Sequence, residues 1–135
     1  MKRASALAVL LFAACLAASA AAADLYVIAN TAVELQPDDV RDVFLGEKQF
    51  AGSVRLHPVD NAAAQEAFLS RVMRLSSAAY ATAWTKKAFR QGLTQPPLHS
   101  SDAEVLEFVR RTQGAVGYVG RTPPAGVKVL QKLAN

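Results

Sequence analysis

The N-terminal segment is the feature that most limits what this chain can fold into. Lys2 and Arg3 precede an apolar run over residues 4–18, and small residues fill positions 19–23. A basic start, a short apolar run and small residues at the −3 and −1 positions are typical of a secretory signal. We therefore expect residues 1–23 to be a signal peptide and residues 24–135 to form a single domain.

The same segment limits where the protein resides. Its apolar run is shorter than the ~20 residues that a helix needs to cross a bilayer, so we expect no membrane span. Phe12-Ala13-Ala14-Cys15 resembles a bacterial lipobox, in which the cysteine is lipidated, but Phe is a poor match at its first position. We expect a soluble periplasmic protein, with a lipid anchor at Cys15 as the alternative.

Removal of the signal changes the charge and the cysteine content. Without Lys2 and Arg3, 13 of the 15 basic residues remain against 11 acidic ones, a net charge of +2. So small a charge gives no support to a nucleic-acid partner. Cys15 is the one cysteine of the sequence, so the domain has neither a disulfide nor a thiol nucleophile. A domain of about 112 residues can bury a core without such crosslinks.

Hydrophobic periodicity predicts an alternation of strands and helices. Strands are expected at 25–29, 54–59, 114–119 and 127–130. Helices are expected from Pro37 to the stop at Gly46, after the cap at 60–61, after Ser76 or Ser77, and behind a capping box at 101–104. Early alternation of the two kinds of element predicts an α/β sandwich with a mainly parallel sheet.

Few residues could carry catalysis. His57 and His99 lie far apart in sequence, with no second ligand at metal-binding spacing. The serines precede helices, where capping explains them, and none lies in a glycine elbow. We therefore expect no catalytic residue, no metal and no cofactor, and a protein that is not an enzyme. Tyr80 and Trp84 are one helical turn apart and fit either a core pair or a ligand-stacking pair.

Polar residues follow two of the predicted strands. Asn30 and Thr31 come after the first strand, and Asp60 and Asn61, with Gln65, come after the second. Ligands of open α/β sheets bind beyond the carboxyl ends of strands. If the two exits are adjacent, these five residues outline a small polar crevice for a small anion or another small ligand. Turn and cap residues without a ligand are the alternative.

Three segments together resemble a known family. They are Ile28-Ala29-Asn30, the stretch LQPDDVRDVFLGEKQF over residues 35–50, and GAVGYV over residues 114–119. Their order and spacing are similar to those of phosphate-type periplasmic substrate-binding proteins. The central stretch, with AFLSRVM at residues 67–73, AYATAWTKKAFRQG at 79–92 and Pro96-Pro97, resembles a short single-domain branch of that family, so the resemblance covers about residues 25–120. The resemblance implies a single lobe of a three-layer, type II periplasmic-binding-protein-like fold and a role beside an ABC transporter.

The sequence departs from that family at its phosphate loop. Where the family carries a Ser-Gly-Thr, this chain has Ala62-Ala63-Ala64, and Asp60 lies near the family's arginine. Phosphate needs charge-assisted donors, which these residues do not supply. We expect weak binding of a small ligand, or of one other than phosphate. The alternative is a periplasmic interaction or sensory accessory domain whose former cleft face docks an envelope protein.

Overall fold

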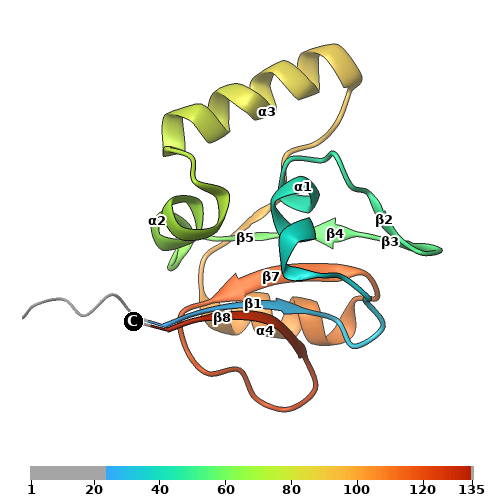
Figure 1. The fold of residues 1–135 in the computed structure, drawn as a ribbon, viewed down its shortest axis with the longest axis vertical. Helices are drawn as coiled ribbons and strands as arrows, with labels where there is room; N and C mark the ends of the chain where they lie inside the picture. Colours follow the sequence, from blue (N-terminus) through green and yellow to red (C-terminus); the bar gives the residue numbers. More distant parts are fainter. Residues whose placement is uncertain (1–23, 135) are drawn as a thin grey trace, which may run out of the picture.

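The computed structural model describes residues 24–134, and Figure 1 shows how their elements are arranged. The predicted signal and Cys15 lie outside the described residues. The strands are β1 (Leu25–Ala29), β2 (Phe50–Ala51), β3 (Val54–Arg55), β4 (His57–Pro58), β5 (Asp60–Asn61), β6 (Leu98–His99), β7 (Ala115–Val119) and β8 (Lys128–Leu133). The helices are η1 (Pro37–Asp39), α1 (Val40–Phe44), α2 (Gln65–Phe68), η2 (Leu69–Met73), α3 (Ser77–Gln91) and α4 (Asp102–Arg111).

The main sheet has four strands in the order β4-β7-β1-β8, and two pairs of short strands, β2-β3 and β5-β6, flank it. β4 runs parallel to β7, and β5 runs parallel to β6. β1 runs antiparallel to both of its neighbours, β7 and β8.

The direction of β1 differs from the mainly parallel sheet that the sequence predicted, although the pairs β4-β7 and β5-β6 follow the prediction. The reason is that β1 is buried on both faces. A central strand covered by helices on both sides is hydrophobic throughout, whichever way its neighbours run, so its apolar run carries no sign of direction.

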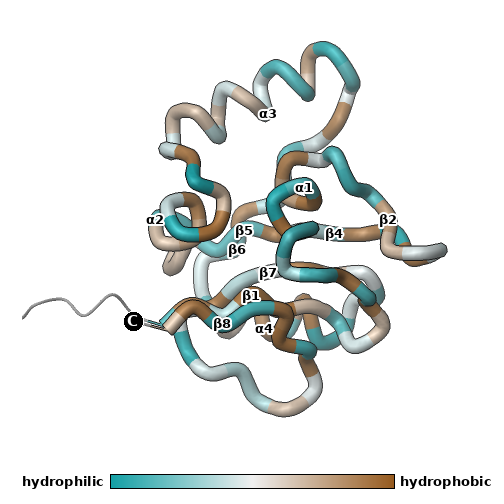
Figure 2. Tube along the Cα trace, viewed as in Figure 1, coloured by the Kyte–Doolittle hydropathy of each residue, from teal (hydrophilic) through white to brown (hydrophobic). Residues whose placement is uncertain are grey.

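Helices cover both faces of this sheet, which confirms the predicted α/β class and its three layers (Figure 1). Along β1, Leu25, Val27 and Ala29 pack into one core cluster with residues of α1, α2, η2 and α3. Tyr26 and Ile28 point the other way, into a second cluster that contains residues of α4. Because successive side chains of a strand point to opposite faces of the sheet, β1 contributes side chains to both hydrophobic clusters. Figure 2 shows hydrophobic residues along β1 and hydrophilic ones in the C-terminal part of α3.

Local capping signals place two helices as predicted. Ser76 caps α3 by accepting a hydrogen bond from the amide of Ala79, and Ser101 caps α4 by accepting from the amide of Glu104. The Glu104 carboxylate accepts a hydrogen bond from the amide of Ser100, whereas the predicted capping box would use the amide of Ser101. Helix α4 then lies against β7, where a Cβ on Gly117 would come within 2.7 Å of the Val105 side chain.

The single strand predicted over residues 54–59 is divided in the structure. β3 turns back on β2 as a hairpin, whereas β4 joins the main sheet beside β7. Leu56, between them, is buried, while Arg55 and His57 on either side are exposed. The predicted alternation of exposed and buried side chains is therefore correct, but the segment is divided between the β2-β3 hairpin and the main sheet. Within residues 24–134, no helix has the length and hydropathy that a bilayer crossing requires.

Candidate functional site

Asn30 holds the end of β1 in place. Its side-chain amide donates to the backbone carbonyls of Val109 and Arg110 at 3.0 and 3.2 Å, and its side-chain oxygen accepts from the amide of Ala32 at 3.0 Å. The backbone amide of Asn30 donates to Ala115 at the start of β7. These contacts make Asn30 a structural link between β1 and α4, and Thr31 beside it is exposed.

Asp60 is 1% exposed and lies between two tyrosines. Its carboxylate accepts a hydrogen bond of 2.7 Å from the hydroxyl of Tyr118 and one of 2.8 Å from the hydroxyl of Tyr80. Burial raises the pKa of Asp60 above its usual 3.8, and the two hydrogen bonds offset part of that shift. Burial and the Asp60 charge likewise raise the pKa values of Tyr80 and Tyr118. The carboxylate therefore serves as a buried tie between β5, β7 and α3.

Asn61 is fully buried and also has its hydrogen bonds satisfied within the protein. Its amide donates to the carboxylate of Asp102 at 2.7 Å and to the carbonyl of Tyr118 at 2.9 Å. Its oxygen accepts from the amide of Ala63 at 3.0 Å. Gln65 begins α2 and is half-buried.

The two predicted strand exits do not come together. Asn30 lies beside Ala115, at the beginning of β7, whereas Asn61 contacts Tyr118, near its end. They are separated by the antiparallel direction of β1, which turns its carboxyl end away from those of β4 and β5. The five residues Asn30, Thr31, Asp60, Asn61 and Gln65 therefore do not line one crevice.

The loop at the position of the family's phosphate site offers few free donors. The backbone amides of Asp60 and Ala62 donate to carbonyls of Pro97 and His99. The amide of Ala64 donates to the backbone carbonyl of Asn61, and the amide of Ala63 donates to the side-chain oxygen of Asn61. Because these amides are already engaged, an anion at this loop would have to break internal hydrogen bonds.

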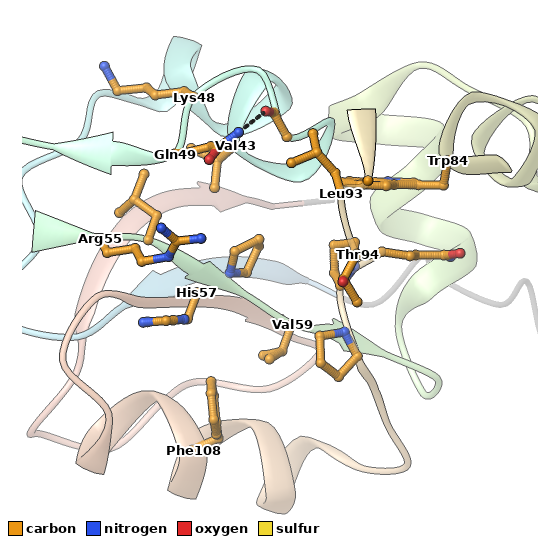
Figure 3. Close-up of a pocket in the computed structure, with 17 residues that line it drawn as sticks. Val43, Lys48, Gln49, Arg55, His57, Val59, Trp84, Leu93, Thr94 and Phe108 are labelled. Atoms are coloured by element: carbon orange, nitrogen blue, oxygen red, sulfur yellow. Dashed lines mark hydrogen bonds between the residues drawn. The ribbon is translucent and has the colours of Figure 1, made fainter. Parts of the chain in front are cut away.

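A pocket of about 340 Å³ lies elsewhere, beside β3 and β4 (Figure 3). More than half of its lining residues are apolar or glycine. The lining consists of Val43, Gly46, Lys48, Gln49, Arg55, Leu56, His57, Pro58, Val59, Trp84, Gly92, Leu93, Thr94, Gln95, Pro96, Pro97 and Phe108. Its size and mostly apolar walls are typical of a small-molecule site.

One side of this pocket is basic. Arg55 and His57 are two residues apart on one strand segment, and Figure 3 shows their side chains on the same side of the pocket. Within residues 24–134, neither forms an ion pair with a carboxylate; the guanidinium of Arg55 lies 5.8 Å from the ring centroid of Phe50. Lys48, at the rim, is 3.9 Å from Asp39.

The other walls are aromatic and aliphatic. Trp84 of α3 donates its indole N–H to the carbonyl of Phe44 at 3.0 Å, so it presents only its ring to the pocket. Leu93 and Thr94 lie beside it on the chain that leaves α3, and Phe108 of α4 points in from the opposite end (Figure 3). Gly46, which has a φ of +72°, lies so close to Trp84 that a Cβ would approach the indole to 2.9 Å.

Sequence reasoning did not find this pocket, because its residues come from five separate segments. The sequence drew attention to His57 only beside His99 and to Trp84 only beside Tyr80; His57 is exposed and Trp84 is buried. The alternation of Arg55, Leu56 and His57 is the one sequence signal that places two basic side chains on a common face.

Two further features of the described residues bear on chemistry. No group of three histidine, cysteine or acidic side chains in this part of the chain could hold a metal ion. A second, more open hollow of about 540 Å³ lies between α2 and the start of α3 and is lined by both Glu66 and Arg74. It lacks aromatic walls, so the first pocket is the stronger candidate.

Comparisons with known proteins give structural similarity without a sequence match. No protein-family model and no curated protein matches the sequence. An ABC-type phosphate transport receptor from Vibrio cholerae has a TM-score of 0.49 and 15% identity, over 82% of this chain and 47% of the receptor. PstS from Borrelia burgdorferi has a TM-score of 0.49 and 14% identity, over 73% of this chain and 41% of PstS. The chain thus spans less than half the length of either structure.

Proposed function

We propose that this chain is an exported, non-enzymatic, single-domain protein that binds a small ligand in the pocket between β3, β4, α3 and α4. The observation that carries the proposal is the pocket itself: about 340 Å³, mostly apolar, with basic side chains on one side. An N-terminal secretory pattern and the sequence resemblance to periplasmic substrate-binding proteins support export and a binding role.

We do not expect inorganic phosphate to bind at the loop of residues 60–65, where the resemblance would place it. Asp60 and Asn61 are buried and fully hydrogen-bonded, and the amides around them are engaged. The carboxylates at this loop, Asp60 and Asp102, repel an anion. The function proposed is therefore that of a substrate-binding-like protein whose ligand site differs from the one that the resemblance implies.

Trp84 provides a direct test, since it is the one tryptophan of the sequence and lies in the pocket wall. The purified protein is titrated with a panel of small metabolites, including phosphate, sulfate and organic acids, by calorimetry and by Trp84 fluorescence. We expect at least one ligand to bind with a change in fluorescence. Thr94→Phe, which fills the pocket mouth, should weaken that binding, whereas Thr82→Phe on the exposed face of α3 should not.

A docking function is the second candidate, and Phe89 is the observation that favours it. This side chain is 93% exposed on α3, although isolated exposed apolar residues are common. If no panel member binds at millimolar concentration, the small-ligand function is wrong and the docking function takes its place.

A further inference from the structure

The pocket has an electrostatic asymmetry that narrows its ligand class. Among its lining residues, three are basic, and no aspartate or glutamate is present. Lys48 already has Asp39 nearby, but Arg55 and His57 have no carboxylate at ion-pair distance within the described residues. A guanidinium without a counter-charge attracts a carboxylate or phosphate group and binds it through paired N–H donors.

Backbone geometry places these two side chains. Leu56 is buried between them, so the two-residue period turns both Arg55 and His57 to the exposed side. Gly114, with a φ of +85°, lies against this segment: a Cβ there would collide with the Arg55 carbonyl oxygen and come within 3.4 Å of the His57 ring. The close approach of Gly114 thus holds the backbone that carries both basic residues.

The remaining walls are suited to an apolar body rather than to a second charge. Trp84 and Leu93 lie across the pocket from the basic side, and Phe108 points in from α4 (Figure 3). The N–H of Trp84 is engaged by Phe44, so this wall makes only apolar contacts. An inorganic anion would leave these walls uncovered, whereas the apolar body of an organic acid would cover them and be removed from water.

We infer that the pocket selects small organic carboxylates with a planar or branched apolar body, the carboxylate facing Arg55 and His57 and the body facing Trp84 and Phe108. This inference rests on the proposed function, since it names the ligand class of the same site. It differs from the resemblance, which implies an inorganic oxyanion at a different loop.

The test uses matched acids and amides, which share an apolar body and differ in charge. Phenylacetate and benzoate are compared with phenylacetamide and benzamide by calorimetry on the purified protein. We expect each acid to bind about tenfold tighter than its amide, the effect of a charge-assisted hydrogen bond at a solvent-accessible site. Inorganic phosphate at the same concentration should not displace phenylacetate.

Variants of Arg55 test whether the preference for acids over amides arises in this pocket. Arg55→Gln should bring the acid-to-amide ratio close to one, and Arg55→Lys, which keeps the charge, should retain part of the preference. Arg74→Gln, which removes an exposed arginine of the second hollow, should leave the ratio unchanged. Thermal unfolding of each variant confirms that it is folded.

The outcomes separate the two claims. Amides that bind as tightly as the acids, a preference that survives Arg55→Gln, or displacement by phosphate would overturn the carboxylate inference while leaving a small-ligand function in place. Failure of acids, amides and the wider panel to bind would overturn the proposed function as well.

Discussion

Asp60 illustrates how a residue that suggests a binding site by its position can have a structural role instead. Its carboxylate lies at a strand exit, as ligand-binding residues do, but two tyrosine hydroxyls close over it at 2.7 and 2.8 Å. Tyr118 in turn stacks on Phe68, with ring centroids 3.8 Å apart. The carboxylate is thereby enclosed by the aromatic core and withdrawn from solvent.

Asp60→Asn should change how stability depends on pH. Because burial raises the pKa of Asp60 in the folded state, its contribution to stability is full below the unfolded value of 3.8 and is lost as pH rises through the folded pKa. The stability of the wild type relative to Asp60→Asn should therefore fall over that interval. Urea unfolding at a series of pH values measures this difference.

Asp38→Asn, at an exposed position of η1, serves as the control. A difference between wild type and Asp60→Asn that stays constant with pH would show that the Asp60 carboxyl is not the titrating group.

At the scale of elements, the segment from β3 to β4 links the hairpin, the main sheet and the pocket. The amide of His57 donates to the carbonyl of Gly114, and β4 continues parallel to β7. Gly114 can occupy this position because it has a positive φ and no side chain to meet the Arg55 carbonyl. One close backbone approach therefore positions both the edge of the sheet and the basic side of the pocket.

Gly114→Ala should destabilise the protein by about 2–5 kcal/mol, from the cost of a left-handed conformation together with overpacking. Gly52→Ala is the matched control, since Gly52 also has a positive φ, of +61°, but nothing lies within 4 Å of its added Cβ. It should cost about 1–2 kcal/mol, the conformational part alone. Equal losses in the two variants, measured by urea unfolding, would mean that the segment yields to the new methyl group.

At the scale of the whole molecule, the sequence predicted the α/β class, the ends of several helices and the location of most strands. These features depend on local signals, such as the caps at Ser76 and Ser101 and the left-handed stop at Gly46. The direction of β1 was not predictable, because it depends on which strand lies beside it. The predicted site was wrong for the same reason: a parallel β1 would have placed Asn30 and Asn61 at one edge of the sheet.

The pocket was unpredictable for a related reason. Arg55, Trp84 and Phe108 belong to three elements that the fold alone brings together, and each has an ordinary explanation in its local context. Polar residues at strand ends gave a stronger sequence signal, but in the structure their hydrogen bonds stabilise the fold. The candidate site therefore lies where apolar walls meet Arg55, which has no carboxylate partner among the described residues, and it lies away from the strand exits.

Amide NMR can locate the bound ligand residue by residue. When phenylacetate is titrated into isotope-labelled protein, we expect chemical-shift changes at the pocket, including Gly46, Leu93, Thr94 and the indole of Trp84. The amides of Asn61, Ala63 and Gln65 should not move. Shifts concentrated at residues 60–65, with the pocket signals unchanged, would show that the ligand binds at the strand exits and not in the pocket.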